Sequence, residues 1–130
     1  MKKIKLCLVG ANGRLGLSIK KCLTENNNFN PSVAISKEGA TDGFKYSSKN
    51  FNGIEASQTD VIIDFSSTEM LKKTVGYAVK NGIPLVVGVT GLDELELKTL
   101  KEASKKNSNF VFPKYERWSC NIKVSLKNFF

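Results

Sequence analysis

Three glycines near the N-terminus, Gly10, Gly13 and Gly16, have a spacing that could hold a phosphate group. They follow an apolar run, and a helical apolar pattern begins directly after them. In such a unit the first glycine lets the chain reverse, the second lets backbone approach a pyrophosphate, and the third lets helix and strand pack closely. The helix N-terminus then faces the anion. We therefore expect a dinucleotide to contact Gly10, Ala11, Asn12, Gly13, Arg14 and Leu15.

The end of the second predicted strand, residues 32–36, is another candidate contact with a dinucleotide. At this point an NAD site usually offers an acidic residue to the ribose 2′-hydroxyl, and an NADP site offers a basic residue to the 2′-phosphate. Ser36 is not acidic and Lys37 is basic, so both are expected to contact the cofactor and NADP(H) is favoured. Two alternatives stay open. Glu38, which is acidic and close in sequence, would support NAD as the cofactor. Lys37 would, in the other alternative, be an ordinary surface lysine without a ligand.

Two further strand ends could complete a ligand site. Residues 60–65 and 85–88 are apolar runs typical of strands buried on both faces of a parallel sheet. Ligands of such sheets bind outside the carboxyl ends of the strands. On the adenosine side the candidate contacts are Phe65 and the carbonyls and hydroxyls of residues 64–67, and on the nicotinamide side they are Gly88, Val89 and Thr90. Each turn could also be a plain connection, with Ser66 serving only to cap the helix that follows.

Strand and helix patterns alternate along the whole chain. Strands are predicted at residues 4–9, 32–36, 60–65, 85–88 and 109–112, and helices after Gly16, after Ser66 as far as Gly82, and from Asp93 to Lys106. Residues 37–59 are polar and are expected to form a long connection with at most a short strand near Lys45. This order predicts an α/β fold, a Rossmann-like doubly wound parallel sheet in a single domain.

Composition limits the class of protein. With 130 residues and 41% hydrophobic residues, the chain is long enough for one domain with a real core. Its net charge of +8 favours anionic partners, although lysines on solvated helix faces account for part of it. The absence of histidine excludes histidine catalysis and histidine metal ligation. We expect no catalytic residue and no metal site, no membrane partner because no apolar run is long enough, and a cytoplasmic location because no signal segment is apparent.

Three motifs together resemble the N-terminal half of the dihydrodipicolinate reductase family. They are residues 9–16, 60–66 and 84–92, and the resemblance covers residues 4–113. Arg14 matches the family's glycine motif, Leu15 replaces a methionine, and Val89 replaces one threonine of a Gly-Thr-Thr-Gly loop. The resemblance implies NADPH or NADH as cofactor and hydride transfer to a cyclic imine in the diaminopimelate and lysine pathway. We also count Phe112 and Pro113, at the end of the last strand, among the cofactor-binding residues.

The family pattern stops after Pro113. In the family, an Asn-containing hinge leads there into a second domain with the substrate site, a Glu-x-His-His-x-x-x-Lys motif and the tetramer contacts. We expect residues 1–113 to be an NAD(P)-binding domain, residues 114–130 to be a non-family tail, and the substrate and tetramerisation domain to be absent. Such a chain would bind cofactor with little or no turnover by itself, as a monomer or weak oligomer, unless a separate chain supplies the second domain.

The genetic code offers one explanation of the tail. With codons that the code allows for residues 113–120, removing one A from the Lys114 codon yields Pro-Asn-Met-Ser-Val-Gly-Val, which is the family's hinge. The glycine of this shifted sequence does not depend on a choice of codon, because Trp118 has a single codon and its last two bases begin a glycine codon in the new frame. Our hypothesis is that residues 114–130 are out of frame, the alternative is chance in the choice of codons, and sequencing of the locus decides between them.

A second class of function stays open beside the reductase interpretation. The chain could be a stand-alone nucleotide-binding module or a basic nucleic-acid binder, in which aromatic side chains such as Tyr115 and Trp118 among lysines would stack on bases. We rank this below dinucleotide binding. Salt-sensitive binding of an oligonucleotide without binding of NADPH would reverse the order.

Overall fold

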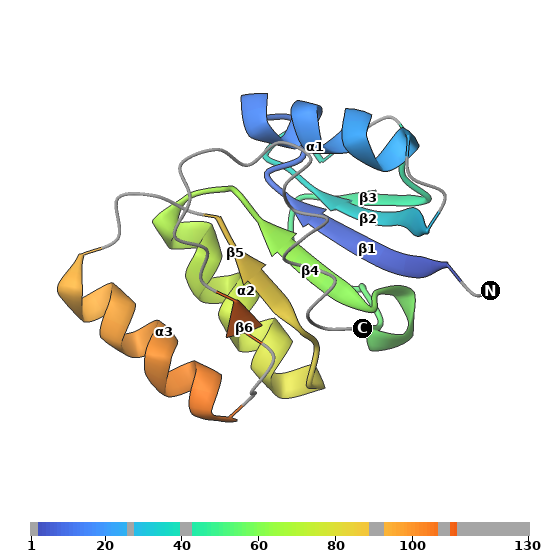
Figure 1. Ribbon diagram of the computed structural model, residues 1–130. Helices are drawn as coiled ribbons and strands as arrows, with labels where there is room; N and C mark the ends of the chain where they lie inside the picture. Colours follow the sequence, from blue (N-terminus) through green and yellow to red (C-terminus); the bar gives the residue numbers. More distant parts are fainter. Residues whose placement is uncertain (1–2, 26–27, 40–42, 89–92, 107–109, 112–130) are drawn as a thin grey trace.

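The computed structural model describes residues 3–25, 28–39, 43–88, 93–106 and 110–111 (Figure 1). The strands are β1 Ile4–Val9, β2 Phe29–Ile35, β3 Tyr46–Ser48, β4 Val61–Asp64, β5 Leu85–Val87 and β6 Phe110–Val111. The helices are α1 Arg14–Thr24, α2 Thr68–Asn81 and α3 Glu94–Lys106, with a short 3₁₀ helix, η1, at Ala56–Gln58. The predicted alternation of strand and helix is therefore confirmed, apart from boundaries.

All neighbouring strands pair in parallel, in the order β3-β2-β1-β4-β5-β6. The chain runs outward from β1 to β3 on one side and then returns to β1 to build β4 to β6 on the other. The strand order thus reverses between β1 and β4, and this is the place where open α/β sheets bind ligands. The predicted Rossmann-like α/β class is confirmed.

Alternate side chains of the central strands feed two separate cores. On one face, Leu6 and Leu8 of β1 pack with Ile19 and Leu23 of α1. The other core contains Cys7 and Val9 of β1, together with Leu71 and Ala78 of α2 and Leu100 of α3. Figure 1 accordingly shows α1 on one side of the sheet and α2 and α3 on the other. Burial on both faces explains why the central strands read as continuous apolar runs.

The second strand begins earlier than its apolar pattern indicates. Pairing of β1 with β2 starts at Ile4 with Phe29 and runs through Pro31, which precedes the predicted strand at residues 32–36. The register shifts between Leu6 and Cys7, next to this proline. Proline has no N–H to donate to the ladder, so a local irregularity of this kind lets the strand continue past it.

The long polar connection after β2 is fixed to α2 by an aromatic contact. The rings of Phe51 and Tyr77 stack with centroids 4.5 Å apart, and the Tyr77 hydroxyl donates to the Ile54 carbonyl oxygen at 2.8 Å. The only strand described within residues 37–59 is β3, which confirms the expectation of at most a short one. Among the residues that the structure describes, no helix combines the length and the apolar composition needed to cross a membrane.

The start of α2 differs from the predicted cap. Ser67, rather than Ser66, accepts a hydrogen bond at the helix N-terminus, from Met70 N at 3.3 Å. Ser66 instead donates both its backbone N–H, at 2.8 Å, and its hydroxyl to Asp64 Oδ1. The buried carboxylate at the end of β4 therefore takes the hydroxyl that the sequence pattern had given to the helix. The other predicted ends are confirmed: Gly82 ends α2 with φ +64°, and Asp93 and Glu96 form a capping box at α3.

Asp64 is fully buried on the α2 side of the sheet, and its Oδ2 has no hydrogen-bond partner among the described residues. Thr74 lies near it and lowers the pKa of Asp64 somewhat, but the Thr74 hydroxyl donates its hydrogen to the Met70 carbonyl oxygen at 3.1 Å. Loss of solvation by burial is the largest effect and raises the pKa of Asp64, although hydrogen bonds from Ser66 oppose it. A neutral side chain would therefore suit this position at least as well.

Substitution of the third glycine tests the close packing of α1 on the glycine turn. A Cβ at Gly16 would lie 2.3 Å from the Gly10 carbonyl oxygen and 2.6 Å from that of Ala11, both backbone atoms. We expect Gly16→Ala to lower the free energy of unfolding by about 1–3 kcal/mol, as overpacking does. The control is Gly76→Ala in the interior of α2, where a Cβ would meet nothing within 4 Å, and the gain in helix propensity should stabilise by about 0.5–1 kcal/mol. Equal effects in urea denaturation would contradict this account.

The Asp64 environment predicts the sign of a pH dependence. Because the pKa of Asp64 is raised in the folded protein, the native state binds more protons than the unfolded chain between the ordinary aspartate pKa of about 3.9 and the folded value. Stability contributed by this group therefore falls as pH rises through that window. In Asp64→Asn this fall should be absent, so the variant gains relative to the wild type as pH rises. Chemical denaturation at several pH values measures it, and parallel profiles for the two proteins would show that Asp64 does not titrate this way.

Candidate cofactor-binding site

The glycine turn is fixed to its neighbours by backbone contacts. Gly10 has φ +84°, and its N–H donates to the Ile35 carbonyl oxygen at 2.8 Å, which ties the turn to the end of β2. A Cβ at Gly10 would lie 3.0 Å from Ser66 N and 3.1 Å from the Phe65 carbonyl carbon. Only glycine combines this φ with this proximity. The ends of β1, β2 and β4 consequently meet at one place.

The turn leads directly into the N-terminus of α1. Gly13 occupies the position before the helix with no side-chain cap, and its N–H donates to the Gly10 carbonyl oxygen at 3.1 Å. The first N–H groups of an α-helix have no partner within the helix, so they and the helix dipole favour an anion here. Arg14 begins the helix and Leu15 follows in its first turn, and only the backbone of these two residues is described.

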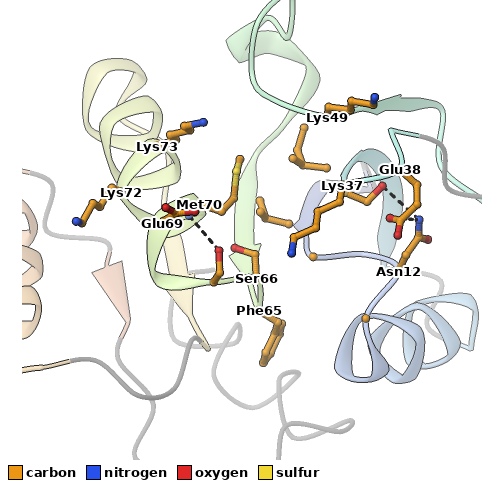
Figure 2. Close-up of a pocket in the computed structure, with 16 residues that line it drawn as sticks. Asn12, Lys37, Glu38, Lys49, Phe65, Ser66, Glu69, Met70, Lys72 and Lys73 are labelled. Atoms are coloured by element: carbon orange, nitrogen blue, oxygen red, sulfur yellow. Dashed lines mark hydrogen bonds between the residues drawn. The ribbon is translucent and has the colours of Figure 1, made fainter.

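A cavity of about 760 Å³ lies over these strand ends (Figure 2). This volume falls within the range of small-molecule and cofactor sites. The lining comes from the glycine turn, the ends of β2 and β4, the residue after β3, and the first turns of α2. It comprises Val9, Gly10, Asn12, Gly13, Ile35, Ser36, Lys37, Glu38, Lys49, Phe65, Ser66, Ser67, Glu69, Met70, Lys72 and Lys73.

Charged side chains of both signs line the cavity, with four lysines and two glutamates. Figure 2 shows the Lys37 ammonium pointing into the cavity, whereas the Lys49 ammonium points away from it. Lys72 and Lys73 are exposed on α2, as expected for lysines on a solvated helix face, although they also border the cavity. Of the four lysines that line the cavity, Lys37 is thus best placed to meet an anionic ligand (Figure 2).

A small polar network joins the glycine turn to the end of β2. Asn12 Nδ2 donates to Ser36 Oγ and to Glu38 Oε2, both at 3.2 Å. A hydrogen bond from its own backbone N–H, followed by the one from Asn12, holds the pKa of Glu38 below its ordinary value. Glu38 is therefore ionised at neutral pH, with its carboxylate beside the glycine turn.

Phe65 and Gly88 are in contact at the ends of β4 and β5. A Cβ at Gly88 would lie only 2.2 Å from a carbon of the Phe65 ring, so a glycine there leaves room for the ring. The backbone of Phe65 donates to the Val9 carbonyl oxygen at 3.0 Å, and that of Gly88 donates to the Asp64 carbonyl oxygen at 2.8 Å. Phe65 lines the cavity, while Gly88 is buried and is not among the lining residues.

The predicted contacts therefore divide into four groups. Those that the structure brings together around the cavity are Gly10, Asn12, Gly13, Ser36, Lys37 and Phe65. Ala11 and Gly88 are buried and are not among the lining residues, and Arg14 and Leu15 begin α1. The predicted contacts Val89, Thr90, Phe112 and Pro113 lie outside the described residues.

Sequence reasoning did not select the contribution of α2 or of the residue after β3. Lys49, Glu69 and Met70 line the cavity without having been predicted as cofactor contacts, whereas Ser66 and Ser67, whose hydroxyls were candidates for the adenosine side, also line it. The serines follow a buried strand, and this is the signal that made them candidates. Lys49 carries no such signal, because its position depends on where the short strand β3 pairs with β2.

The chemistry available here is that of binding. Cys7 is a fully buried thiol, and burial, followed by the charge of Asp64, raises its pKa, so it is a poor nucleophile. Across the described ranges, no three His, Cys, Asp or Glu residues are grouped so as to hold a metal ion. A turn of backbone N–H groups, a helix N-terminus and an inward lysine suit a phosphate-bearing ligand.

Comparison with known proteins agrees with this arrangement. Residues 4–115 match the family model described as dihydrodipicolinate reductase, N-terminus. The chain is 38% identical over 103 residues to a 4-hydroxy-tetrahydrodipicolinate reductase of Caldanaerobacter subterraneus subsp. tengcongensis, covering 79% of this chain and 40% of the relative. A Campylobacter jejuni subsp. doylei protein with the same name is 31% identical over 126 residues, covering 97% of this chain and 44% of the relative. The chain thus spans about 40% of the length of these curated relatives.

Solved structures share the fold. The dipicolinate-bound dihydrodipicolinate reductase of Paenisporosarcina sp. TG-14 aligns with a TM-score of 0.66 at 15% identity, over 82% of this chain and 44% of the other. The myo-inositol 2-dehydrogenase of Lactobacillus plantarum aligns with a TM-score of 0.72 at 19% identity, over 97% and 40%. Identities this low show the fold alone, whereas the family follows from the match over residues 4–115. The chain belongs to the dihydrodipicolinate reductase N-terminal family.

Proposed function

We propose that this chain binds a nicotinamide dinucleotide in the cavity described above, as the cofactor-binding part of a 4-hydroxy-tetrahydrodipicolinate reductase. The observation that carries the proposal is the meeting of the glycine turn, Ser36–Lys37 and Phe65–Ser67 around one cavity, at the point where the strand order reverses. Family membership and dehydrogenase neighbours support a nicotinamide cofactor.

In this proposal each part of the site has a separate task. The N–H groups between Gly10 and Gly13, and the start of α1, hold the pyrophosphate. The end of β2 holds the adenosine ribose, and Lys37 meets the 2′-phosphate of NADPH. Phe65 covers one side of the adenosine. When bound, the nicotinamide would supply the hydride for reduction of the substrate.

In this proposal the described cavity binds the cofactor, and substrate binding and turnover need other residues. The chain covers about 40% of the length of its curated relatives. We propose that this chain alone binds the cofactor without reducing a substrate, that it is a monomer or weak oligomer, and that it acts in the cytoplasm. Residues 114–130 are proposed to be a tail outside the cofactor domain.

Ligand-dependent stability tests the proposed function directly. A ligand that binds only the native state raises stability by RT ln(1 + [L]/Kd), which is about 2.7 kcal/mol at one hundred times Kd. We expect NADPH and NADH to raise the melting temperature of the full chain and dipicolinate to leave it unchanged. No shift with either dinucleotide, together with salt-sensitive binding of a single-stranded oligonucleotide, would favour a nucleic-acid function instead.

Lys37 provides a test of cofactor preference. A charge-assisted hydrogen bond contributes enough that Lys37→Ala should weaken NADPH by about tenfold or more and leave NADH nearly unchanged. Lys49→Ala is the matched control, because Lys49 lines the same cavity with its ammonium pointing away (Figure 2), and it should change both affinities little. Titrations at fixed ionic strength measure the NADPH and NADH dissociation constants of the wild type and of each variant. Equal losses of NADPH and NADH affinity in Lys37→Ala would mean that Lys37 does not contact the 2′-phosphate.

A further inference from the structure

The residues after β2 form a tight turn that fixes two opposite charges. Gly39 N donates to the Ser36 carbonyl oxygen at 3.1 Å, which closes a β-turn with Lys37 and Glu38 at its two central positions. Gly39 N also lies 3.2 Å from Ser36 Oγ, and Gly39 has φ +76°. Both central side chains line the cavity. The cation and the carboxylate are therefore presented to a ligand by one hydrogen-bonded turn.

Asn12 determines where the carboxylate lies. Its Nδ2 contacts both Ser36 Oγ and Glu38 Oε2 at 3.2 Å, so the amide bridges the start and the centre of the β-turn. Figure 2 shows the Glu38 carboxylate turned toward Asn12, while Lys37 extends into the open part of the cavity. Glu38 is thus drawn toward the glycine turn, the side on which the proposed function places the pyrophosphate and ribose.

An ionised carboxylate at this place distinguishes the two dinucleotides. It can accept hydrogen bonds from the ribose hydroxyls of NADH, and it repels the 2′-phosphate of NADPH, which replaces one of those hydroxyls. Ser36, which occupies the usual acidic position at the strand end, has a neutral hydroxyl. Glu38 lies two residues later in the sequence, and the turn and Asn12 bring its carboxylate back to the site.

We propose that Glu38, positioned by Asn12, is the ribose-hydroxyl acceptor of this site and opposes Lys37 in the choice between NADH and NADPH. This inference rests on the proposed function, because it names a specificity residue of the same cavity. Glu38 acts on the cofactor directly, and Asn12 is a positioning residue that acts through Glu38.

The test is the ratio of the NADH and NADPH dissociation constants, measured by fluorescence titration of the full chain at low ionic strength. In Glu38→Gln, NADPH should bind about two- to fivefold more tightly and NADH about two- to fivefold more weakly, the range of an exposed charge interaction. Asn12→Ala should move the ratio in the same direction, and the double variant should move it no further than Glu38→Gln alone.

Glu69→Gln is the matched control. Glu69 lines the same cavity from α2, across from Asn12 and Glu38 (Figure 2), so its substitution removes the same charge at a different place. An unchanged ratio in this variant supports a local role for Glu38. A similar change in both variants would show a general effect of net charge and overturn the inference.

Failure of the inference can be distinguished from failure of the proposed function. If the wild type binds both dinucleotides and Glu38→Gln leaves the ratio unchanged, only the role of Glu38 is wrong. If Asn12→Ala and Glu38→Gln shift the ratio additively, the positioning role of Asn12 is wrong. If the wild type binds neither NADH nor NADPH, both the proposed function and this inference are overturned.

Discussion

The close approach of backbone at the point where the strand order reverses is the constraint on which the rest of the structure depends. Gly10 leaves no room for a Cβ beside Ser66 and Phe65, and Gly16 leaves none beside the carbonyl oxygens of Gly10 and Ala11. With a Cβ at either position, the glycine turn could not lie between β2 and β4 with α1 packed against it. The cavity lies where the turns after β1, β2 and β4 meet, and this meeting requires glycine at positions 10 and 16.

The buried carboxylate of Asp64 belongs to the same constraint. By accepting the N–H and hydroxyl of Ser66, it fixes the turn after β4 that Gly10 approaches. This arrangement costs stability, since Oδ2 is buried without a hydrogen bond among the described residues and burial raises the pKa of the group. The hydrogen bonds of Asp64 thus hold the turn after β4 in place, although burial of the carboxylate lowers the stability of the fold.

The sequence predicted those features that depend on residues near one another in the chain. Alternation of apolar strands and helices gave the fold class, and the spacing of the glycines located the turn. The cap of α2 was placed one residue early because it depends on Asp64, whose burial follows from the whole sheet. The contribution of Lys49 and the contact of Asn12 with Glu38 could not be derived from the sequence, because each joins segments that only strand pairing brings together.

Cofactor choice in such a site depends on a small difference between two affinities. Most of the interactions proposed here, with the pyrophosphate, the common ribose and the adenine, are the same for NADH and NADPH and cancel in the comparison. What differs is one hydroxyl against one phosphate, and the β-turn of Ser36 to Gly39 offers a cation and an anion to that one position. In the proposal above, the Asn12 amide orients the Glu38 carboxylate toward this position. Lys37 and Glu38 are both exposed, so neither charge contributes much to the stability of the fold. In this proposal the fold fixes where a dinucleotide binds, whereas two neighbouring surface residues, Lys37 and Glu38, select between NADH and NADPH.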